Sequence, residues 1–353
     1  MAVETDQIVL TPAHYDAAEK MALQTFGYAQ ISAFRSKTYE DHGFPTRMLN
    51  SNELWRYADN IFNHDPSRQQ PDRFFRTTPL FTRFTLDERD LIQRIGLGVS
   101  KLIMESCGKK YQARYALLGA IGLFRVIDAI KKFYRKENYS LFEAGPGTGY
   151  TGLMLALNGH KYISYDVTQA TYIWQSELLR HFLGKEFLET AIVPTPEFSA
   201  RVVHLPWWQY SRLYKNCPIK ADFILSNANL AEMHPLSLQY LLRLGREILS
   251  DSDVGMLVFA SVGGPHMSSQ SSVEDEIYSA GYKRVLSQKV FAYVLQDRDV
   301  PIELKETMEE RIPFFDPSLR GGELAPNELV DFGEARRTLE QQFWHFSNDP
   351  RYV

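Results

Sequence analysis

Cysteine is scarce in this sequence, which has only two among 353 residues, Cys107 and Cys217. Two isolated thiols cannot build a disulfide framework, and their spacing matches no metal-binding motif, so we expect a reducing, cytoplasmic setting. Long apolar runs are also missing, because the stretch from Tyr115 to Phe124 is interrupted by Arg125 before it could cross a bilayer. The first residues lack the basic start and apolar core of a secretory signal.

No long basic run appears along the chain. Lysine and arginine total 39 against 43 acidic residues, which gives a net charge of −4. The densest basic cluster, at 131–136, lies at the end of an expected helix, where the helix dipole favours cations. The sequence therefore predicts no nucleic-acid partner and no membrane insertion.

The first third of the chain has a helical pattern with few strand signals. Thr11-Pro12 predicts the start of a helix that runs to about residue 37. Thr85-Leu86-Asp87-Glu88 has the pattern of a capping box, and it predicts a helix that continues to about Cys107. Another helix is expected over 113–134. We expect this helical section to pack on, or to cap, the domain that follows it.

From Tyr139 onward, expected strands alternate with expected helices, which implies parallel β-α-β units. The strands are expected at 141–144, 162–166, 201–204, 222–226 and 256–260, with two more within 284–295, and the helices at 149–158, 169–183, 235–249 and 272–280. The last two strands would be joined by a tight turn and run antiparallel. The predicted fold is an α/β, doubly wound, Rossmann-like seven-stranded sheet with an antiparallel last strand. The expected division is a helical section at 1–112, the α/β domain at 113–297 and a C-terminal extension at 298–353.

A glycine-rich loop between the first expected strand and its helix predicts a ligand site. The run from Gly147 to Gly152 fits a dinucleotide-binding pattern, with Asp166 at about the expected distance of 20 residues. The run from Glu143 to Gly149 also fits the acid-and-three-glycines loop of S-adenosylmethionine enzymes. A dinucleotide places its anionic pyrophosphate on the helix start, where a carboxylate would repel it. S-adenosylmethionine carries an ammonium and a sulfonium, so the acidic residue favours this cofactor.

These motifs resemble the class I S-adenosylmethionine-dependent methyltransferases. Glu143-Ala-Gly145-Pro-Gly147-Thr-Gly149 is similar to their first motif, and Tyr162-Ile-Ser-Tyr-Asp166 is similar to their second strand. Residues 142–149, 159–169 and 226–229 are also similar to a bacterial family described as sugar O-methyltransferases. The resemblance implies that Asp166 holds the ribose hydroxyls and that Leu205 packs beside the adenine. The expected cofactor-binding residues are Glu143, Gly145, Gly147, Gly149, Asp166, Val167, Leu205 and Asn227.

The catalytic residues are expected in the segment after the fourth strand of the domain, because ligands of open α/β sheets bind beyond the carboxyl ends of the strands. O-methylation needs a base to take the hydroxyl proton, and histidine titrates in the required range. We expect His234 as this base, with Glu232 as an alternative base or orienting partner and His266 as a second base candidate. The alternative is that His234 and Glu232 simply begin the next helix.

Asn229 and Trp207 are the expected substrate-binding residues, although core packing explains a buried tryptophan equally well. No carboxylate cluster typical of a hard cation stands out, so we expect no metal. The predicted function is methyl transfer by in-line displacement to a hydroxyl of a sugar or polyhydroxylated metabolite. A NAD(P)-dependent oxidoreductase and a non-catalytic S-adenosylmethionine-binding protein stay open as alternatives. The helical section and the C-terminal extension, which is acidic, would line the acceptor site or form a homodimer interface.

Overall fold

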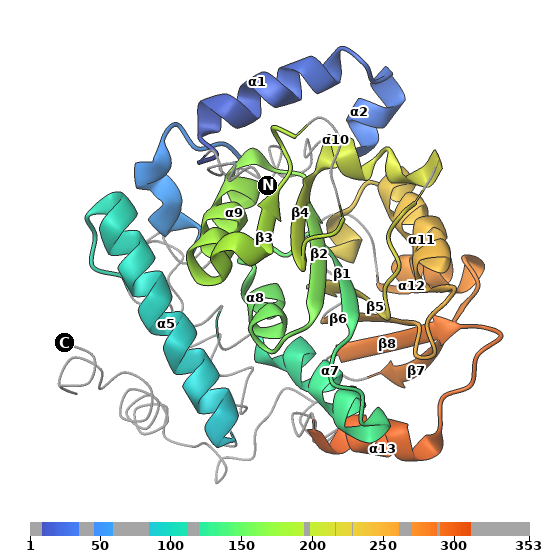
Figure 1. Ribbon diagram of the computed structural model, residues 1–353. Coiled ribbons are helices and arrows are strands. Elements are labelled where there is room, and N and C mark those ends of the chain that lie inside the picture. Colours follow the sequence, from blue (N-terminus) through green and yellow to red (C-terminus); the bar gives the residue numbers. More distant parts are fainter. Residues whose placement is uncertain are drawn as a thin grey trace, which may run out of the picture.

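The computed structural model describes residues 9–34, 46–58, 85–111, 117, 120–193, 198–215, 217–227, 229–260, 270–287 and 290–311. An eight-stranded sheet forms its centre, with helices on both sides (Figure 1). The strands are β1 (Ser140–Ala144), β2 (Lys161–Asp166), β3 (Phe187–Glu189), β4 (Val202–Pro206), β5 (Phe223–Asn227), β6 (Met256–Ala260), β7 (Tyr282–Ser287) and β8 (Val290–Leu295).

The strand order is β3-β4-β2-β1-β5-β6-β8-β7, and β8 runs antiparallel to both of its neighbours. This order confirms the predicted doubly wound, Rossmann-like fold with an antiparallel last strand. The prediction of seven strands is corrected to eight, because β3 adds a parallel edge strand beside β4. Strand β3 has only three residues, Phe187–Glu189, which is too short for a periodic pattern to reveal. The chain runs from β1 outward through β2 on one side, and after β4 it crosses to β5 on the other side of β1. This reversal of strand order marks the crevice where such sheets bind ligands.

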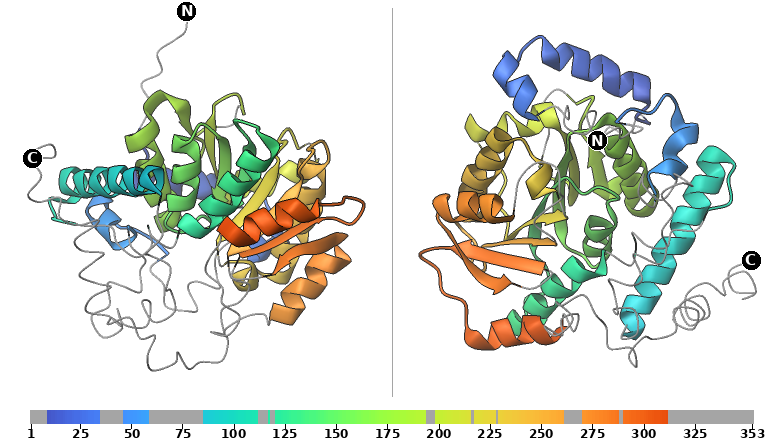
Figure 2. Two further views of the ribbon diagram at one scale, coloured as in Figure 1. Left: turned by 90° about the horizontal axis from the view of Figure 1, so that it is seen from below. Right: turned by 180° about the vertical axis from the view of Figure 1, so that it is seen from behind.

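Helices cover both faces of the sheet. The longer ones are α1 (Pro12–Leu23), α2 (Tyr28–Phe34), α5 (Leu86–Cys107), α7 (Ile121–Tyr134), α8 (Tyr150–Leu157), α9 (Gln169–Leu183), α11 (Pro235–Leu249), α12 (Gln270–Ser279) and α13 (Ile302–Arg311). The short ones are η1 (Ser51–Arg56), η4 (Gly184–Glu186), α10 (Trp207–Tyr210), η5 (Leu213–Lys215) and η6 (Leu230–Glu232). Helices α8 and α9 lie on one side of the sheet, and α11 and α12 lie on the other (Figure 2). The central strands are therefore buried on both faces, which explains their continuous apolar runs.

The N-terminal section differs in one respect from the prediction. The expected helix from Thr11-Pro12 to residue 37 is instead two helices, α1 and α2, with a turn between Leu23 and Tyr28. Gly27 lies in this turn, and glycine is a poor helix former. The Thr85 capping box with Glu88 and the helix end at Cys107 are confirmed.

A buried ion pair joins this helical section to the α/β domain. Arg125 of α7 donates to Glu88 of α5 through Nε at 2.7 Å and through Nη2 at 2.8 Å, and both side chains are almost fully buried. Removing one partner of such a pair typically costs about 3–5 kcal/mol, because the other charge stays in the interior. The pair therefore fixes α5 against the α/β domain.

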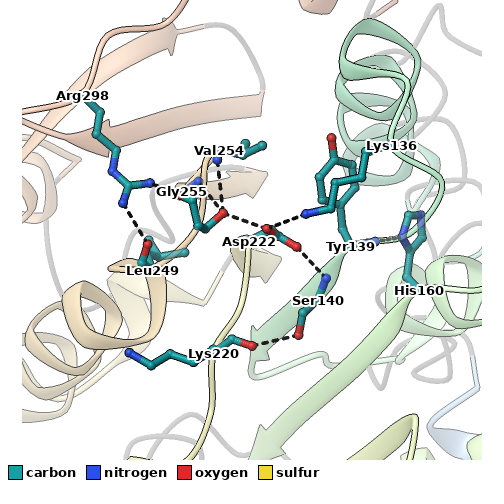
Figure 3. A network of polar contacts seen from close by, with 11 residues as sticks. Lys136, Tyr139, Ser140, His160, Lys220, Asp222, Leu249, Val254, Gly255 and Arg298 are labelled. Carbon is teal, nitrogen blue, oxygen red and sulfur yellow. Dashed lines mark hydrogen bonds and ion pairs between the residues drawn. The ribbon is translucent and has the colours of Figure 1, made fainter.

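A second polar network closes the sheet at the amino ends of its central strands (Figure 3). The Asp222 carboxylate, just before β5, accepts hydrogen bonds from Ser140 N–H at 2.9 Å and from Ser252 Oγ at 2.8 Å. Lys136 Nζ lies 3.1 Å from the same carboxylate. Arg298, after β8, donates to the carbonyl oxygens of Leu249 at 3.2 Å and Ser250 at 2.8 Å, which satisfies the end of α11. These contacts hold the strands in register and leave the carboxyl ends of the strands for ligands.

Candidate functional site

The glycine loop after β1 has the backbone of a ligand-binding turn. Gly145, Gly147 and Gly149 have φ angles of +59°, +61° and +75°, a region that side chains with a Cβ rarely adopt. At Gly147 a Cβ would meet no atom within 4 Å among the described residues, so this part of the loop faces open space. Within the same part of the chain, no side chain caps the start of α8. The loop therefore presents bare backbone and a helix start at the carboxyl end of β1.

Asn229, an expected substrate-binding residue, is placed by the structure against the glycine loop itself. Its Nδ2 donates to the Ala144 carbonyl oxygen at 2.8 Å, and its Oδ1 accepts a hydrogen bond from the Ser226 hydroxyl. A Cβ at Gly145 would lie 1.8 Å from Nδ2, so only glycine leaves room for this amide. Asn229 thus joins the ends of β1 and β5.

Two side chains of α9 support the loop from the other direction, and the sequence analysis did not identify either of them. Trp174 Nε1 donates to the Thr148 carbonyl at 2.9 Å. Gln175 Nε2 donates to the Gly147 carbonyl at 2.7 Å and to Asp166 Oδ2 at 2.8 Å. The sequence gives no local signal for these contacts, because the loop carbonyls of Thr148 and Gly147 lie 26 residues from Trp174 and 28 residues from Gln175, respectively.

Asp166 ends β2 beside this loop and is nearly buried. Its carboxylate accepts hydrogen bonds from Val167 N–H at 2.7 Å, Thr168 N–H at 3.1 Å and the Thr171 hydroxyl at 2.7 Å, in addition to Gln175. Burial raises the pKa of Asp166, and these hydrogen bonds oppose the rise. The Thr168 hydroxyl also donates to Oδ1, at 3.5 Å, so four of the five donors bind Oδ1 and Oδ2 retains acceptor capacity toward a ligand hydroxyl.

Glu143 lies one residue before the end of β1 and is fully buried. Tyr162 donates its hydroxyl to Glu143 Oε2 at 2.5 Å, while Oε1 has no hydrogen-bond partner in the part of the chain that the structure describes. Burial raises the pKa of Glu143 to about 7, the Tyr162 hydrogen bond lowers it, and nearby Asp166 raises it. A cation beside this carboxyl group would stabilise its ionised form, whereas an anion would destabilise it.

Glu232 and His234 follow β5 in the chain, and both are half-buried. His234 is the N-cap of α11, because its Nδ1 accepts a hydrogen bond from Leu236 N–H at 3.2 Å. The accepting Nδ1 must be unprotonated, so the neutral ring carries its proton on Nε2. In this tautomer the Nε2–H group of His234 is a hydrogen-bond donor. The contact that His234 makes in the structure agrees with the alternative interpretation, in which this residue begins the next helix.

The remaining expected site residues fall into different surroundings. Leu205 is buried in β4, paired with Tyr165, whereas Val167 and Asn227 are half-buried at the ends of β2 and β5. Trp207 is fully buried, and its indole N–H donates to Glu19 Oε1 at 2.9 Å. His266 lies outside the described residues. Glu143, the loop glycines, Asp166 and Asn227 are thus brought to the carboxyl ends of three neighbouring strands.

Two further properties concern metals and membranes. Over the described ranges, no group of three or more His, Cys, Asp or Glu side chains could hold a metal ion. Over the same ranges, every helix is too short or too polar to cross a bilayer.

No protein-family model and no curated protein matches this sequence. Among solved structures, the chain is similar to a TehB-like S-adenosylmethionine-dependent methyltransferase from Corynebacterium glutamicum, with 14% identity and a TM-score of 0.36 over 49% of this chain and 87% of that one. It is also similar to a 1,6-didemethyltoxoflavin N1-methyltransferase from Burkholderia thailandensis, with 15% identity and a TM-score of 0.34 over 49% and 79%. The N-methyltransferase NodS from Bradyrhizobium japonicum gives 11% identity and a TM-score of 0.35 over 50% and 87%. The fold assignment rests on the strand order of the sheet itself.

Proposed function

We propose that this protein is an S-adenosylmethionine-dependent methyltransferase that methylates a hydroxyl of a sugar-like acceptor. The observation that carries the proposal is the glycine loop, which is left-handed at Gly147, open above it, and followed by the uncapped start of α8. A loop of this kind admits a ligand to bare backbone without steric cost. The sugar-like acceptor is supported by the sequence resemblance described above.

The charge of the site favours a cationic ligand over a dinucleotide. Glu143 is buried next to the loop, and one of its oxygens has no partner within the described residues. A pyrophosphate at the helix start would face this carboxyl group and oppose its ionisation. The ammonium and sulfonium of S-adenosylmethionine would instead stabilise the carboxylate, so the residues present fit this cofactor.

In the proposed arrangement, Asp166 accepts hydrogen bonds from the ribose, and Leu205 packs beside the adenine. The bound cofactor supplies an electrophilic methyl group on a sulfonium. Because the His234 ring keeps its proton on Nε2 while Nδ1 caps α11, His234 orients the acceptor as a hydrogen-bond donor. Glu232, in the η6 turn before it, accepts the hydroxyl proton. This assignment exchanges the roles that the sequence analysis gave to the two residues.

Calorimetric titration tests the cofactor, with S-adenosylhomocysteine and NAD added separately to the full chain. We expect binding of S-adenosylhomocysteine and no binding of NAD. Binding of NAD alone would replace the proposal with the oxidoreductase alternative.

Mass spectrometry tests the reaction across a panel of sugars and nucleotide sugars, in which a methylated acceptor gains 14 daltons (about one CH₂ group). Binding of S-adenosylhomocysteine without any mass gain across hydroxyl acceptors would favour the non-catalytic alternative. A gain on amine-containing acceptors alone would contradict O-methylation.

A further inference from the structure

The side-chain amide of Gln175 on α9 lies between the two parts of the proposed cofactor site. Its Nε2 donates to the Gly147 carbonyl oxygen at 2.7 Å and to Asp166 Oδ2 at 2.8 Å, and the residue is only 1% exposed. An amide nitrogen has two hydrogens, so these two bonds use the whole donor capacity of the side chain. One buried amide therefore connects the glycine loop after β1 to the acid at the end of β2.

The stem of the same side chain packs against the loop. A Cβ at Gly149 would lie 3.3 Å from Gln175 Cγ, so the glycine leaves room for this side chain. At Gly147, by contrast, a Cβ would meet no atom within 4 Å among the described residues. Gln175 thus contacts the loop at two glycines without filling the open space at the Gly147 Cβ position.

Gln175 also determines how the Asp166 carboxylate is oriented. Oδ1 accepts hydrogen bonds from Val167 N–H, Thr168 N–H and the Thr171 hydroxyl, all within five residues of Asp166 in the sequence. Among the described residues, Gln175 is the one that donates to Oδ2. A carboxylate oxygen has about two acceptor positions, so Oδ2 keeps one for a ligand hydroxyl. Gln175 therefore holds the oxygen that is expected to bind ribose.

We propose that Gln175 is a positioning residue for the cofactor, which fixes Asp166 Oδ2 relative to the glycine loop. This inference rests on the proposed function, in which the loop and Asp166 bind two parts of one ligand. Without the amide, the described structure would hold the carboxylate through Oδ1 alone. The affinity for the ribose hydroxyls should then fall, because Oδ2 would no longer be preorganised to accept their hydrogen bond.

The test measures how strongly the protein distinguishes adenosine from 2′,3′-dideoxyadenosine, which differ only in the two ribose hydroxyls. Calorimetric competition against S-adenosylhomocysteine gives the Kd of each nucleoside, and their ratio is the readout. Gln175→Met keeps the length and packing of the side chain but removes the amide. Trp174→Phe is the matched control, because it removes the neighbouring hydrogen bond from α9 to the Thr148 carbonyl, which does not involve Asp166.

We expect the wild type to bind adenosine at least about tenfold more tightly than the dideoxy analogue, the effect of a hydrogen bond to a charged acceptor. Gln175→Met should reduce this preference to about threefold or less. Trp174→Phe should keep the wild-type preference even if both Kd values rise, because a loosened loop weakens both nucleosides equally. The ratio compares two ligands on the same folded molecules, so a loss of stability alone does not change it.

Asp166→Ala, alone and combined with Gln175→Met, shows whether Gln175 acts through the carboxylate. The double variant should have the same preference as Asp166→Ala, because the amide then has no carboxylate to hold. Additive effects, an unchanged preference in Gln175→Met or an equal loss in Trp174→Phe would overturn the inference. So would a wild-type chain that binds S-adenosylhomocysteine but does not distinguish the two nucleosides. A wild-type chain that does not bind S-adenosylhomocysteine would instead overturn the proposed function.

Discussion

The substitution Gly145→Ala tests how the glycine loop is held. The new Cβ would lie 1.8 Å from Asn229 Nδ2, so the Asn229 side chain would have to leave its position. Its departure breaks the hydrogen bond to the Ala144 carbonyl and the one from the Ser226 hydroxyl, both of them buried. The substitution therefore combines backbone strain with the loss of the Asn229 hydrogen bonds that join β1 and β5.

The expected loss of stability is the sum of these two effects. An alanine held at φ +59° costs about 1 kcal/mol relative to glycine. Leaving a buried carbonyl and a buried hydroxyl without partners adds about 1–3 kcal/mol. We therefore expect Gly145→Ala to lower the free energy of unfolding by about 3 kcal/mol. Gly108→Ala is the matched control, because Gly108 has φ +62° and its Cβ would meet nothing within 4 Å among the described residues. It should cost only about 1 kcal/mol.

Urea unfolding of Gly145→Ala, Asn229→Ala and the double variant measures the coupling. With Asn229 truncated, the alanine at 145 meets no amide, so the double variant should lose about 2 kcal/mol less than the sum of the two single variants. If the two single losses add to within about 0.5 kcal/mol of the double variant's loss, the proposed interaction between position 145 and the Asn229 amide is refuted. Equal losses in Gly145→Ala and Gly108→Ala would refute it independently.

Two further predictions concern Glu143 and His234. An acid whose native pKa is raised to about 7 keeps its proton in the folded state while the unfolded state loses its own from about pH 4.5, so wild-type stability should fall as the pH rises between these values. Glu143→Gln lacks this loss, so its free energy of unfolding relative to the wild type should rise by about 2 kcal/mol from pH 5 to pH 8. A difference between variant and wild type that is the same at both pH values would contradict the raised pKa of Glu143. His234→Asn preserves an N-cap but removes the Nε2 donor, so it should keep the wild-type Tm and lose turnover, whereas His234→Ala should lose about 1 kcal/mol of stability as well. Full turnover in His234→Asn would exclude His234 from the reaction.

The regular elements were predictable because their signals are local. The bounds of α9 and α11, Gln169–Leu183 and Pro235–Leu249, were predicted to the residue, since an N-cap residue marks the start of each helix and apolar periodicity marks its length. The antiparallel pair β7 and β8 was recognisable from its length and from the polar residues in the middle of this segment of the sequence. The turn that separates α1 from α2 was missed, because a single glycine within a helical pattern is a weak signal.

The contacts that build the site depend on the fold and could not be predicted from the sequence. Asn229 was expected to bind substrate, but its partner, the Ala144 carbonyl, is 85 residues away and comes close only because β1 and β5 are neighbours. Gln175 carries no motif, and its partners come from the glycine loop and from β2. The proposed cofactor follows from sequence reasoning, because Glu143 and the glycines are adjacent in the chain.

The central claim is that S-adenosylmethionine lies on the backbone of the glycine loop, and Gly147→Ala tests it most directly. Gly147 and Gly108 share a left-handed backbone and open space at the Cβ position within the described structure, so both alanine variants should lose about 1 kcal/mol of stability. Only the methyl group at 147 would point into the proposed cofactor position. Calorimetric titration with S-adenosylhomocysteine should give wild-type affinity for Gly108→Ala and a Kd raised at least about tenfold for Gly147→Ala, the effect of a steric penalty of about 1.4 kcal/mol or more. Equal affinity in the two variants would contradict the claim.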